Sequence, residues 1–226
     1  MGARLALVGL GFASATLLQG TADATLQCGC VHVEPEFAPP LLIRDLRGGM
    51  LALHKAGQFN AAGSGGRGGD RDTMRSAEFC DPVGRPDHGL GDFEAFCCLW
   101  ERLDEVRQEL NKQGYELLED MELHYVRYPI GGYYHRHVDD FTEPTVGFGS
   151  RGRVRRISFI VFLTDPDEPW PRAYEADGSG EEQHVDYLPR SGTLVLFDSC
   201  RLQHEVMPTQ RVRSCLIGWF HSATCM

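Results

Sequence analysis

Near residue 115 the hydrophobic pattern of the chain changes from that of helices to that of strands. Before this point apolar residues recur at every third or fourth position, and after it short runs rich in β-branched and aromatic residues follow one another. Helices that come first and strands that come later favour an α+β domain, with the helices packed on one side of a β-sandwich or barrel. A length of 226 residues is enough for one such domain with its own hydrophobic core.

Two helices are predicted before residue 115. Residues 38–57 begin near a pair of prolines and end at Gly57, which suits the start and the end of a helix. Residues 91–113 contain Asp92, a side chain that can cap a helix, and end before Gly114. The apolar face of this second helix consists of Phe93, Phe96, Cys97, Trp100, Leu103, Val106 and Leu110. Such a face predicts that the helix packs against a sheet.

Four strands are predicted after residue 115. Each is short, rich in β-branched or aromatic residues and bounded by Gly, Pro or Asp. They span residues 121–128, 157–164, 193–199 and 214–221. Between the two helices, residues 60–70 are rich in glycine and predict a linker, because the GxxxxGK[ST] pattern of a phosphate-binding loop is absent there.

Two histidines and one aspartate near the predicted strands can bind a metal ion. His137 and Asp139 are two residues apart, so on an extended strand their side chains point to the same face. His204 follows a later strand and turn. Two histidines and one carboxylate leave three positions of a metal open, which is the arrangement of non-haem iron(II) oxygenases. A 2-oxo acid can chelate through two of these positions, and O₂ can take the third.

Arg213 follows His204 by nine residues and stands at the start of the last predicted strand. A planar guanidinium deep in a barrel suits the far carboxylate of a 2-oxo diacid. Arg211 lies on the same strand face by parity, but it falls in the preceding turn, where solvation is expected. An HxD pair, a later histidine and then an arginine, all near strands, form a far more specific pattern than any one of them alone.

Four segments carry the most specific motifs of the chain. They are Tyr128 to Asp139, LPRSGTLVLFDS (188–199), HEVMPT (204–209) and RSCLIGWF (213–220). Together they resemble the prolyl 4-hydroxylase family of iron(II)- and 2-oxoglutarate-dependent dioxygenases, closest in look to the branch of the hypoxia-inducible-factor prolyl hydroxylases and their microbial relatives. The resemblance is good over residues 93–222 and loose over 37–80. It implies a double-stranded β-helix (jelly roll), iron(II), 2-oxoglutarate, O₂ and often ascorbate.

The resemblance also implies roles for single residues and a reaction. The iron ligands are His137, Asp139 and His204. Arg213 anchors 2-oxoglutarate, Tyr128 matches a tyrosine that contacts this cosubstrate, and Tyr134 matches one that lines the pocket near the iron. The implied reaction hydroxylates a peptidyl proline of a protein or peptide substrate, with succinate and CO₂ as coproducts. A small-molecule substrate, another amino-acid residue and a non-catalytic β-helix binding module stay open as alternatives.

The chain departs from the family pattern at two places. Where close relatives carry a tyrosine that helps Arg213 to hold the distal carboxylate, this chain has Phe162, so weaker cosubstrate affinity is expected. The family usually has a Gly-Gly strand between the two halves of its core, and residues 170–180 lack the double glycine. That strand is therefore expected to be altered or missing. Trp170 suits either a substrate platform or packing within a loop.

Other side chains near the motif have more ordinary expectations. His135 is expected at the surface or around the metal ligands rather than among them. Asp140 is expected in solvent, and Glu205 is expected to face away from the metal. Trp219 and Phe220 are expected to pack in the core.

The first 24 residues have the layout of a targeting segment. Arg4 precedes an apolar run from Leu5 to Leu18, and Ala22-Asp23-Ala24 offers a cleavage site between small residues. The run is too short for a stable membrane span, and a transit peptide or a buried or disordered segment stay open as alternatives. The expected division is a targeting segment (1–24), an N-terminal helix and glycine-rich loop (25–92) and the dioxygenase domain (93–226). A cleaved signal implies the secretory pathway or an organelle lumen, and an uncleaved chain implies the cytoplasm.

Charge and cysteine usage exclude several classes of protein. The net charge of −10 and the pI of about 5.3 argue against nucleic acid as a partner, because phosphate binding needs clustered Lys and Arg. The short basic cluster 151–156 favours a solvated loop rim, with a lip for an acidic substrate as the alternative. Eight cysteines form neither a disulfide-rich spacing nor paired CxxC motifs. Cys28, Cys30 and His32 are a weak candidate for a soft metal.

Overall fold

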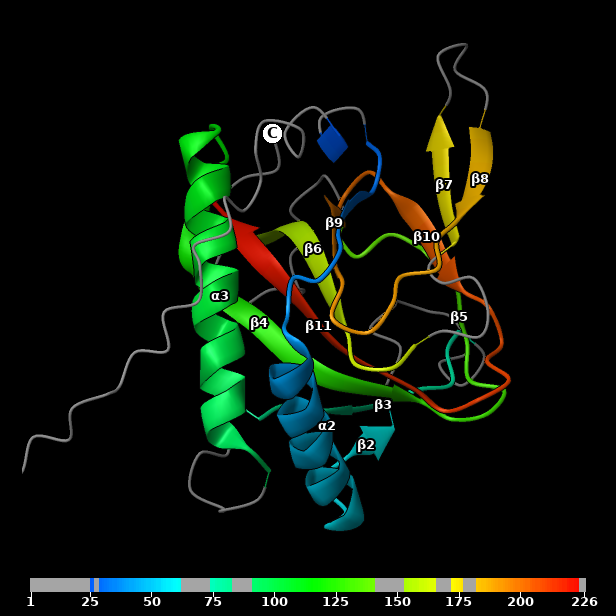
Figure 1. Cartoon of the computed structure of the whole chain (residues 1–226). Coiled ribbons are helices and arrows are strands. Elements are labelled where there is room, and N and C mark those ends of the chain that lie inside the picture. Colours follow the sequence, from blue (N-terminus) through cyan, green and yellow to red (C-terminus); the bar gives the residue numbers. More distant parts are fainter. Residues whose placement is uncertain are drawn as a thin grey trace, which may run out of the picture.

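Two antiparallel β-sheets form the centre of the molecule (Figure 1). The computed structural model describes residues 25–26, 29–61, 74–82, 91–140, 153–165, 172–176 and 182–223. In these residues one sheet has seven strands in the order β1-β9-β6-β11-β4-β3-β2, and the other has four in the order β5-β10-β7-β8. The order is not that of the sequence, so the chain crosses between the sheets as a jelly roll requires.

The strands of the two sheets have the following bounds. The larger sheet contains β1 (His32–Glu34), β9 (Leu194–Asp198), β6 (Val154–Phe162), β11 (Arg213–Ser222), β4 (Leu117–Tyr128), β3 (Glu78–Cys80) and β2 (Asn60–Ala61). The smaller sheet contains β5 (Tyr134–His137), β10 (Gln203–Val206), β7 (Arg172–Ala176) and β8 (Glu182–Asp186). The four predicted strands are present as β4, β6, β9 and β11, with ends shifted by a few residues.

Two long helices cover the outer face of the larger sheet, as Figure 1 shows. Helix α2 spans Pro40–Lys55 and α3 spans Phe93–Lys112, close to the predicted ranges. The carboxylate of Asp92 accepts a hydrogen bond from the backbone N–H of Ala95 at 2.9 Å and so caps α3 as predicted. The expected α+β architecture, with a mainly β jelly-roll core and helices on one side, is confirmed.

The buried face of α3 lies slightly to one side of the predicted face. Leu99, absent from the predicted set, is fully buried, whereas Phe93 is 49% exposed and Cys97 is only half-buried. The buried stripe runs through Phe96, Leu99, Leu103, Val106 and Leu110, which recur at steps of three and four residues. Phe93 and Cys97 lie at the margin of this stripe, so the prediction that they contribute fully to it is wrong.

The larger sheet separates two hydrophobic cores. Alternate residues of one strand enter different cores, since side chains alternate across a strand. On β6, Phe159 packs with the helices, whereas Phe162 packs between the two sheets. On β11, Leu216 faces the helices and Cys215 faces the smaller sheet. The inner side of the larger sheet is thus free to carry functional side chains, because the helix-side core stabilises the sheet from behind.

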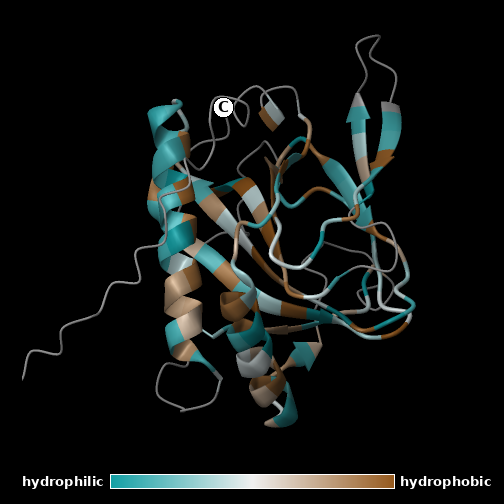
Figure 2. Ribbon diagram, viewed as in Figure 1, coloured by the Kyte–Doolittle hydropathy of each residue, from teal (hydrophilic) through white to brown (hydrophobic). Residues whose placement is uncertain are grey.

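The segment without a double glycine still forms a strand. Residues Arg172–Ala176 form β7, which pairs with β10, and β8 pairs with β7 at the edge of the smaller sheet. The strand is therefore present, and the expectation that it could be missing is wrong. Ala173, a small and fully buried residue, lies opposite His204 in the register. Figure 2 shows mainly hydrophilic colours along β7 and β8.

Several expectations fall on residues outside the described ranges. They concern the targeting segment 1–24, Cys28, residues 62–70 of the glycine-rich linker, Arg151 and Trp170. Among the residues that the structure describes, no helix has both the length and the apolar character to cross a membrane. The short strands β1, β2 and β3 were not predicted, because two or three residues carry no readable period.

Candidate metal centre

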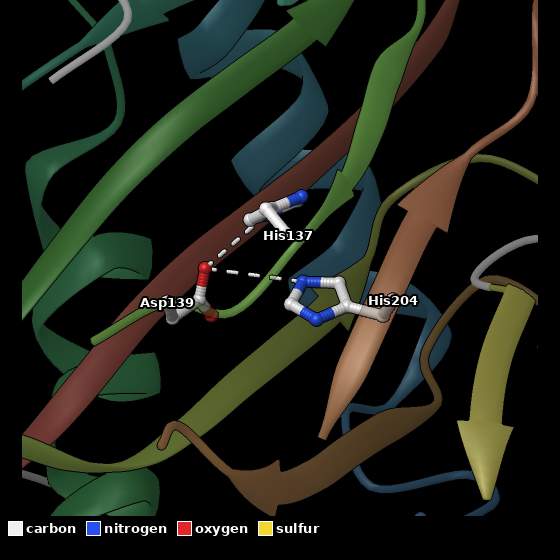
Figure 3. A group of neighbouring side chains, drawn as sticks. All are labelled: His137, Asp139 and His204. Atoms are coloured by element: carbon white, nitrogen blue, oxygen red, sulfur yellow. Dashed lines mark ion pairs between the residues drawn. The ribbon is translucent and has the colours of Figure 1, made fainter. Parts of the chain in front are cut away.

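His137, Asp139 and His204 lie together on the inner side of the smaller sheet (Figure 3). His137 is the last residue of β5 and stands directly opposite His204 of β10 in the antiparallel register. The potential ligand atoms of the three residues all lie within 4.8 Å of one another. One Asp139 oxygen, Oδ1, is 3.4 Å from Nε2 of His137 and 3.8 Å from Nε2 of His204. A metal ion between these three atoms would meet two nitrogens and one oxygen.

Asp139 reaches the site from a bend and not from the strand itself. Strand β5 ends at His137, and the backbone N–H groups of Asp139 and Asp140 both donate to the carbonyl of Ser199 at 3.0 Å. The predicted parity of an extended strand therefore explains His137 but not Asp139. The loop after β9 positions the aspartate, because the carbonyl of Ser199 in that loop holds the backbone of the bend.

Both histidines present the same ring nitrogen to the centre. Nδ1 of His137 lies 2.7 Å from the carbonyl of His135, and Nδ1 of His204 lies 3.2 Å from the carbonyl of Leu202. A carbonyl only accepts, so each Nδ1 carries a proton, and Nε2 is the ring nitrogen that faces the centre. Backbone acceptors of this kind fix the tautomer and the orientation of metal-binding histidines.

The charge states of the cluster suit a divalent cation. Burial, together with the proximity of the His137 ring, lowers the pKa of His204 to about 4, so its imidazole is neutral at neutral pH. Burial alone would raise the pKa of Asp139, but His204, His137 and the hydroxyl of Ser158 together lower it well below its usual range. A neutral imidazole and an ionised carboxylate are the forms that bind metals.

Two residues that the sequence analysis did not assign to the site hold the aspartate. Ser158 Oγ donates to Oδ2 of Asp139 at 2.6 Å, and Nε1 of Trp219 donates to the same oxygen at 3.1 Å. Trp219 is half-buried, so the expectation that it packs in the core is wrong, whereas Phe220 is fully buried as expected. The alternation of side chains along β11 could have indicated this role, because Trp219 follows Arg213 by an even number of residues and so lies on the same face of the strand.

Arg213 begins β11 and is 4% exposed, whereas Arg211 lies in the preceding bend and is exposed. Arg213 stands opposite Tyr128 in the register, and its charge is close enough to affect the pKa of Cys215 on the same face. Burial keeps the pKa of Tyr128 well above its usual value, so its hydroxyl remains a proton donor. Phe162 stands opposite Cys215 and is fully buried.

Tyr134 packs directly on one of the histidines. Its ring lies 3.5 Å from the ring of His137, centroid to centroid, with an interplanar angle of 18°. Tyr134 also contacts Arg75, whose guanidinium lies 5.0 Å from the centroid of the Tyr134 ring. The ring of Phe197 lies 4.6 Å from that of His204. Each of the two histidines thus has an aromatic ring packed against it.

The neighbours of the motif divide into two groups. His135 is exposed and its ring lies 4.7 Å from that of Tyr133, tilted by 44°, and the Glu205 carboxylate accepts from the hydroxyl of Tyr174 at 2.6 Å, so neither joins the cluster. Asp140 is half-buried, and its carboxylate accepts the backbone N–H of Arg155 at 2.7 Å. The expectation that Asp140 is solvated is therefore wrong.

The described arginines of the basic cluster pair with carboxylates of neighbouring segments. Arg153 pairs with Asp120, Arg155 with Glu122 and Arg156 with Asp198. Arg153 is exposed and fits the expected solvated rim, whereas Arg155 and Arg156 are half-buried and connect β6 to neighbouring strands. Their positive charge is largely neutralised within the fold.

Comparisons with known proteins agree with this donor set. Residues 123–221 match the model of the 2OG-Fe(II) oxygenase superfamily. A PKHD-type hydroxylase of Synechococcus elongatus is 36% identical over 97 residues, which are 42% of this chain and 41% of that protein. The chain thus aligns with about two fifths of the length of the curated relatives that it matches.

Two solved structures share the fold. A prolyl-4-hydroxylase of Pseudomonas putida has 28% identity and a TM-score of 0.69, and the match covers 88% of this chain and 96% of that one. A prolyl hydroxylase of Trichoplax adhaerens, solved with a peptide fragment of the hypoxia-inducible-factor oxygen degradation domain, has 19% identity and a TM-score of 0.70. That match covers 88% of this chain and 86% of the other, and it shows likeness of fold.

Fold, donor set and family model define a class of protein. A two-histidine, one-carboxylate cluster on a jelly roll is the donor set expected of mononuclear non-haem iron oxygenases. Residues 123–221 form a 2OG-Fe(II) oxygenase domain, and the chain is a homologue of the PKHD-type hydroxylases.

Proposed function

We propose that this protein is an iron(II)- and 2-oxoglutarate-dependent dioxygenase that hydroxylates a proline of a protein or peptide. The observation that carries the proposal is the convergence of Nε2 of His137, Oδ1 of Asp139 and Nε2 of His204 on one point. When bound there, iron(II) with 2-oxoglutarate and O₂ supplies the oxidation that replaces C–H by C–OH, with succinate and CO₂ as coproducts.

The residues of the chain bind and orient the reactants in this proposal. Arg213, buried at the start of β11, holds the distal carboxylate of 2-oxoglutarate through its planar guanidinium. Tyr128, opposite Arg213 and protonated because its pKa is raised by burial, donates a hydrogen bond to the same cosubstrate. Tyr134 and Phe197 flank the two histidines and exclude water from the reacting atoms.

A peptidyl proline is the substrate that the relatives favour. The Pseudomonas putida structure is that of a prolyl-4-hydroxylase, and the match covers most of both chains. The Trichoplax adhaerens enzyme is a prolyl hydroxylase solved with a peptide. We extend proline hydroxylation and a peptide substrate to this chain on that basis, and ascorbate as the reductant that keeps the iron in its ferrous state.

The test is turnover with purified protein, iron(II), 2-oxoglutarate, O₂ and ascorbate. We expect succinate to form in step with a proline-containing peptide that gains one oxygen atom, detected by mass spectrometry. If succinate forms only with a small molecule, or if another residue gains the oxygen, the proposed substrate is wrong and the proposed reaction stands. Failure to form succinate with any peptide or metabolite, by protein that binds iron(II), would contradict enzymatic function and favour a binding module.

A further inference from the structure

The two oxygens of the Asp139 carboxylate have different surroundings. Oδ1 faces Nε2 of both histidines, at 3.4 and 3.8 Å. Oδ2 accepts hydrogen bonds from Ser158 Oγ at 2.6 Å and from the indole of Trp219 at 3.1 Å. An ionised carboxylate forms strong hydrogen bonds with such donors, so two donors on one oxygen fix the rotation of the whole group.

Ser158 is itself held by Ser199. The two hydroxyls are 2.8 Å apart, and Ser158 gives its single hydroxyl hydrogen to Asp139. Ser199 is therefore the donor to Ser158. The carbonyl of Ser199 also accepts the backbone N–H of Asp139 at 3.0 Å. One serine on the loop after β9 thus positions both the backbone and, through Ser158, the side chain of the aspartate.

An arginine packs over the ring face of Trp219. The guanidinium of Arg155 lies 3.6 Å from the centroid of the indole ring, within the range of a cation–π contact. Arg155 in turn donates to both carboxylate oxygens of Glu122, at 2.5 and 3.3 Å. In the register of the sheet, Trp219 of β11 stands between Ser158 of β6 and Glu122 of β4. The contacts form one row across three strands.

We propose that Ser158 and Trp219 are positioning residues that hold the Asp139 carboxylate in the rotation in which Oδ1 faces both histidines. Ser158 and Trp219 bind Oδ2 and leave Oδ1 alone for the metal, and Arg155 acts as a positioning residue by holding the indole in place. The proposal rests on the metal centre of the proposed function. Its consequence is the number of open positions: a carboxylate that turned and chelated through both oxygens would occupy one position that cosubstrate or O₂ needs.

The closing experiment measures Co(II) binding, a readout that does not depend on activity. Trp219→Phe keeps an aromatic ring for Arg155 but removes the indole N–H. Trp100→Phe is the matched control, because Trp100 lies on α3 against the helix-side core. We expect the Kd for Co(II) to rise about tenfold or more in Trp219→Phe, as for other partners of metal ligands. The visible absorption bands of bound Co(II), which respond to the number of ligand atoms, should change in Trp219→Phe and not in Trp100→Phe.

Two further variants test the rest of the row. Ser158→Ala should weaken Co(II) binding and alter the spectrum as Trp219→Phe does, and Arg155→Lys, which keeps the charge but loses the planar stack, should give a smaller change of the same kind. Wild-type affinity and spectrum in both Ser158→Ala and Trp219→Phe would overturn the proposal. If Trp219→Phe does not fold, a wild-type result for both Ser158→Ala and Arg155→Lys would overturn it.

Asp139→Ala separates this proposal from the function on which it rests. If wild-type protein binds Co(II) and Asp139→Ala does not, the centre stands, and the other variants decide the role of the row. If Asp139→Ala binds Co(II) as tightly as the wild type does, the centre is elsewhere, and both proposals are overturned.

Discussion

At the scale of single residues, the chain offers neighbouring aspartates with different tasks. Asp139 directs one oxygen to two histidines, whereas Asp140 accepts a backbone N–H of Arg155. Asp139→Ala should abolish both iron(II) binding and turnover, because two neutral imidazoles hold a divalent ion poorly. Asp140→Ala should retain iron(II) binding within a few fold. Equilibrium binding under anaerobic conditions measures both, and the reverse result would show that the ligand is misassigned.

Arg213 and Arg211 form a second matched pair. Arg213 is buried at the start of β11, and Arg211 is exposed two residues earlier. A charge-assisted pair with a carboxylate contributes about 1.5–3 kcal/mol, so Arg213→Ala should weaken 2-oxoglutarate binding at least about tenfold. Arg213→Lys should recover part of the loss, since an ammonium keeps the attraction without the fork. Anaerobic titration of 2-oxoglutarate into manganese-loaded protein measures this, and a loss confined to Arg211→Ala would refute the assignment.

At the scale of elements, β11 approaches its neighbours too closely for any side chain at Gly218. A Cβ there would overlap the carbonyl oxygen of Glu122 on β4 and the ring of Phe159 on β6. Gly218→Ala should therefore lower the free energy of unfolding by about 1–3 kcal/mol or more, since the strands must separate. Gly48→Ala is the control, because Gly48 lies in α2 with open space around it. Gly48→Ala should raise the free energy of unfolding by roughly 0.5–1 kcal/mol.

Urea unfolding of the two variants tests this contrast. A Gly218→Ala protein as stable as wild type would mean that β11 can move away from β4 without loss. The spacing of these strands would then not constrain the row that contains Trp219.

Glu122 links strands β4, β6 and β11 through charge. Burial opposes its ionisation, but hydrogen bonds from His124, His221 and Arg155 lower its pKa well below the ordinary 4.5. A depressed carboxyl pKa stabilises the fold above the pKa of the unfolded chain, and this stabilisation is lost as the pH falls below about 4.5. Glu122→Gln should thus be less stable than wild type at neutral pH, and the difference should shrink in acid. Thermal unfolding from pH 7 to pH 3 tests this. A difference in stability between wild type and Glu122→Gln that stays constant over this range would contradict a stabilising role of the Glu122 charge.

At the scale of the whole molecule, the sequence predicted the parts that carry a long or repeated signal. Helices α2 and α3 and strands β4, β6 and β11 were predicted because each contains enough residues for a hydrophobic period, and β9 was predicted because its five residues begin with an apolar run. Strands β5, β7, β8 and β10 have four or five residues and many polar side chains, so their pairing depends on partners distant in sequence. The smaller sheet therefore became visible only in the structure.

The candidate site divides in the same way. The spacing of His137 and Asp139, followed by His204, predicted three side chains that lie together, because two histidines and a carboxylate near strands are typical of a metal site. The role of Arg213 stays a prediction. Ser158 and Trp219 were not predicted, since serine and tryptophan on a strand suit packing equally well. Their role depends on the register of three neighbouring strands, which cannot be predicted from a single sequence.

The opposition of His137 and His204 has a thermodynamic consequence. Strand β5 is an edge strand of four residues, and β10 is its neighbour in the smaller sheet. A metal ion held by both histidines cross-links the two strands, and a ligand that binds only the folded form adds about 2.7 kcal/mol of stability at a hundredfold excess over Kd. Amide hydrogen exchange in Tyr134–His137 should slow on metal loading, and exchange in β8, which carries no ligand, should not. Metal supply would then govern how long the edge of this sheet resists a protease, as well as how fast the site turns over.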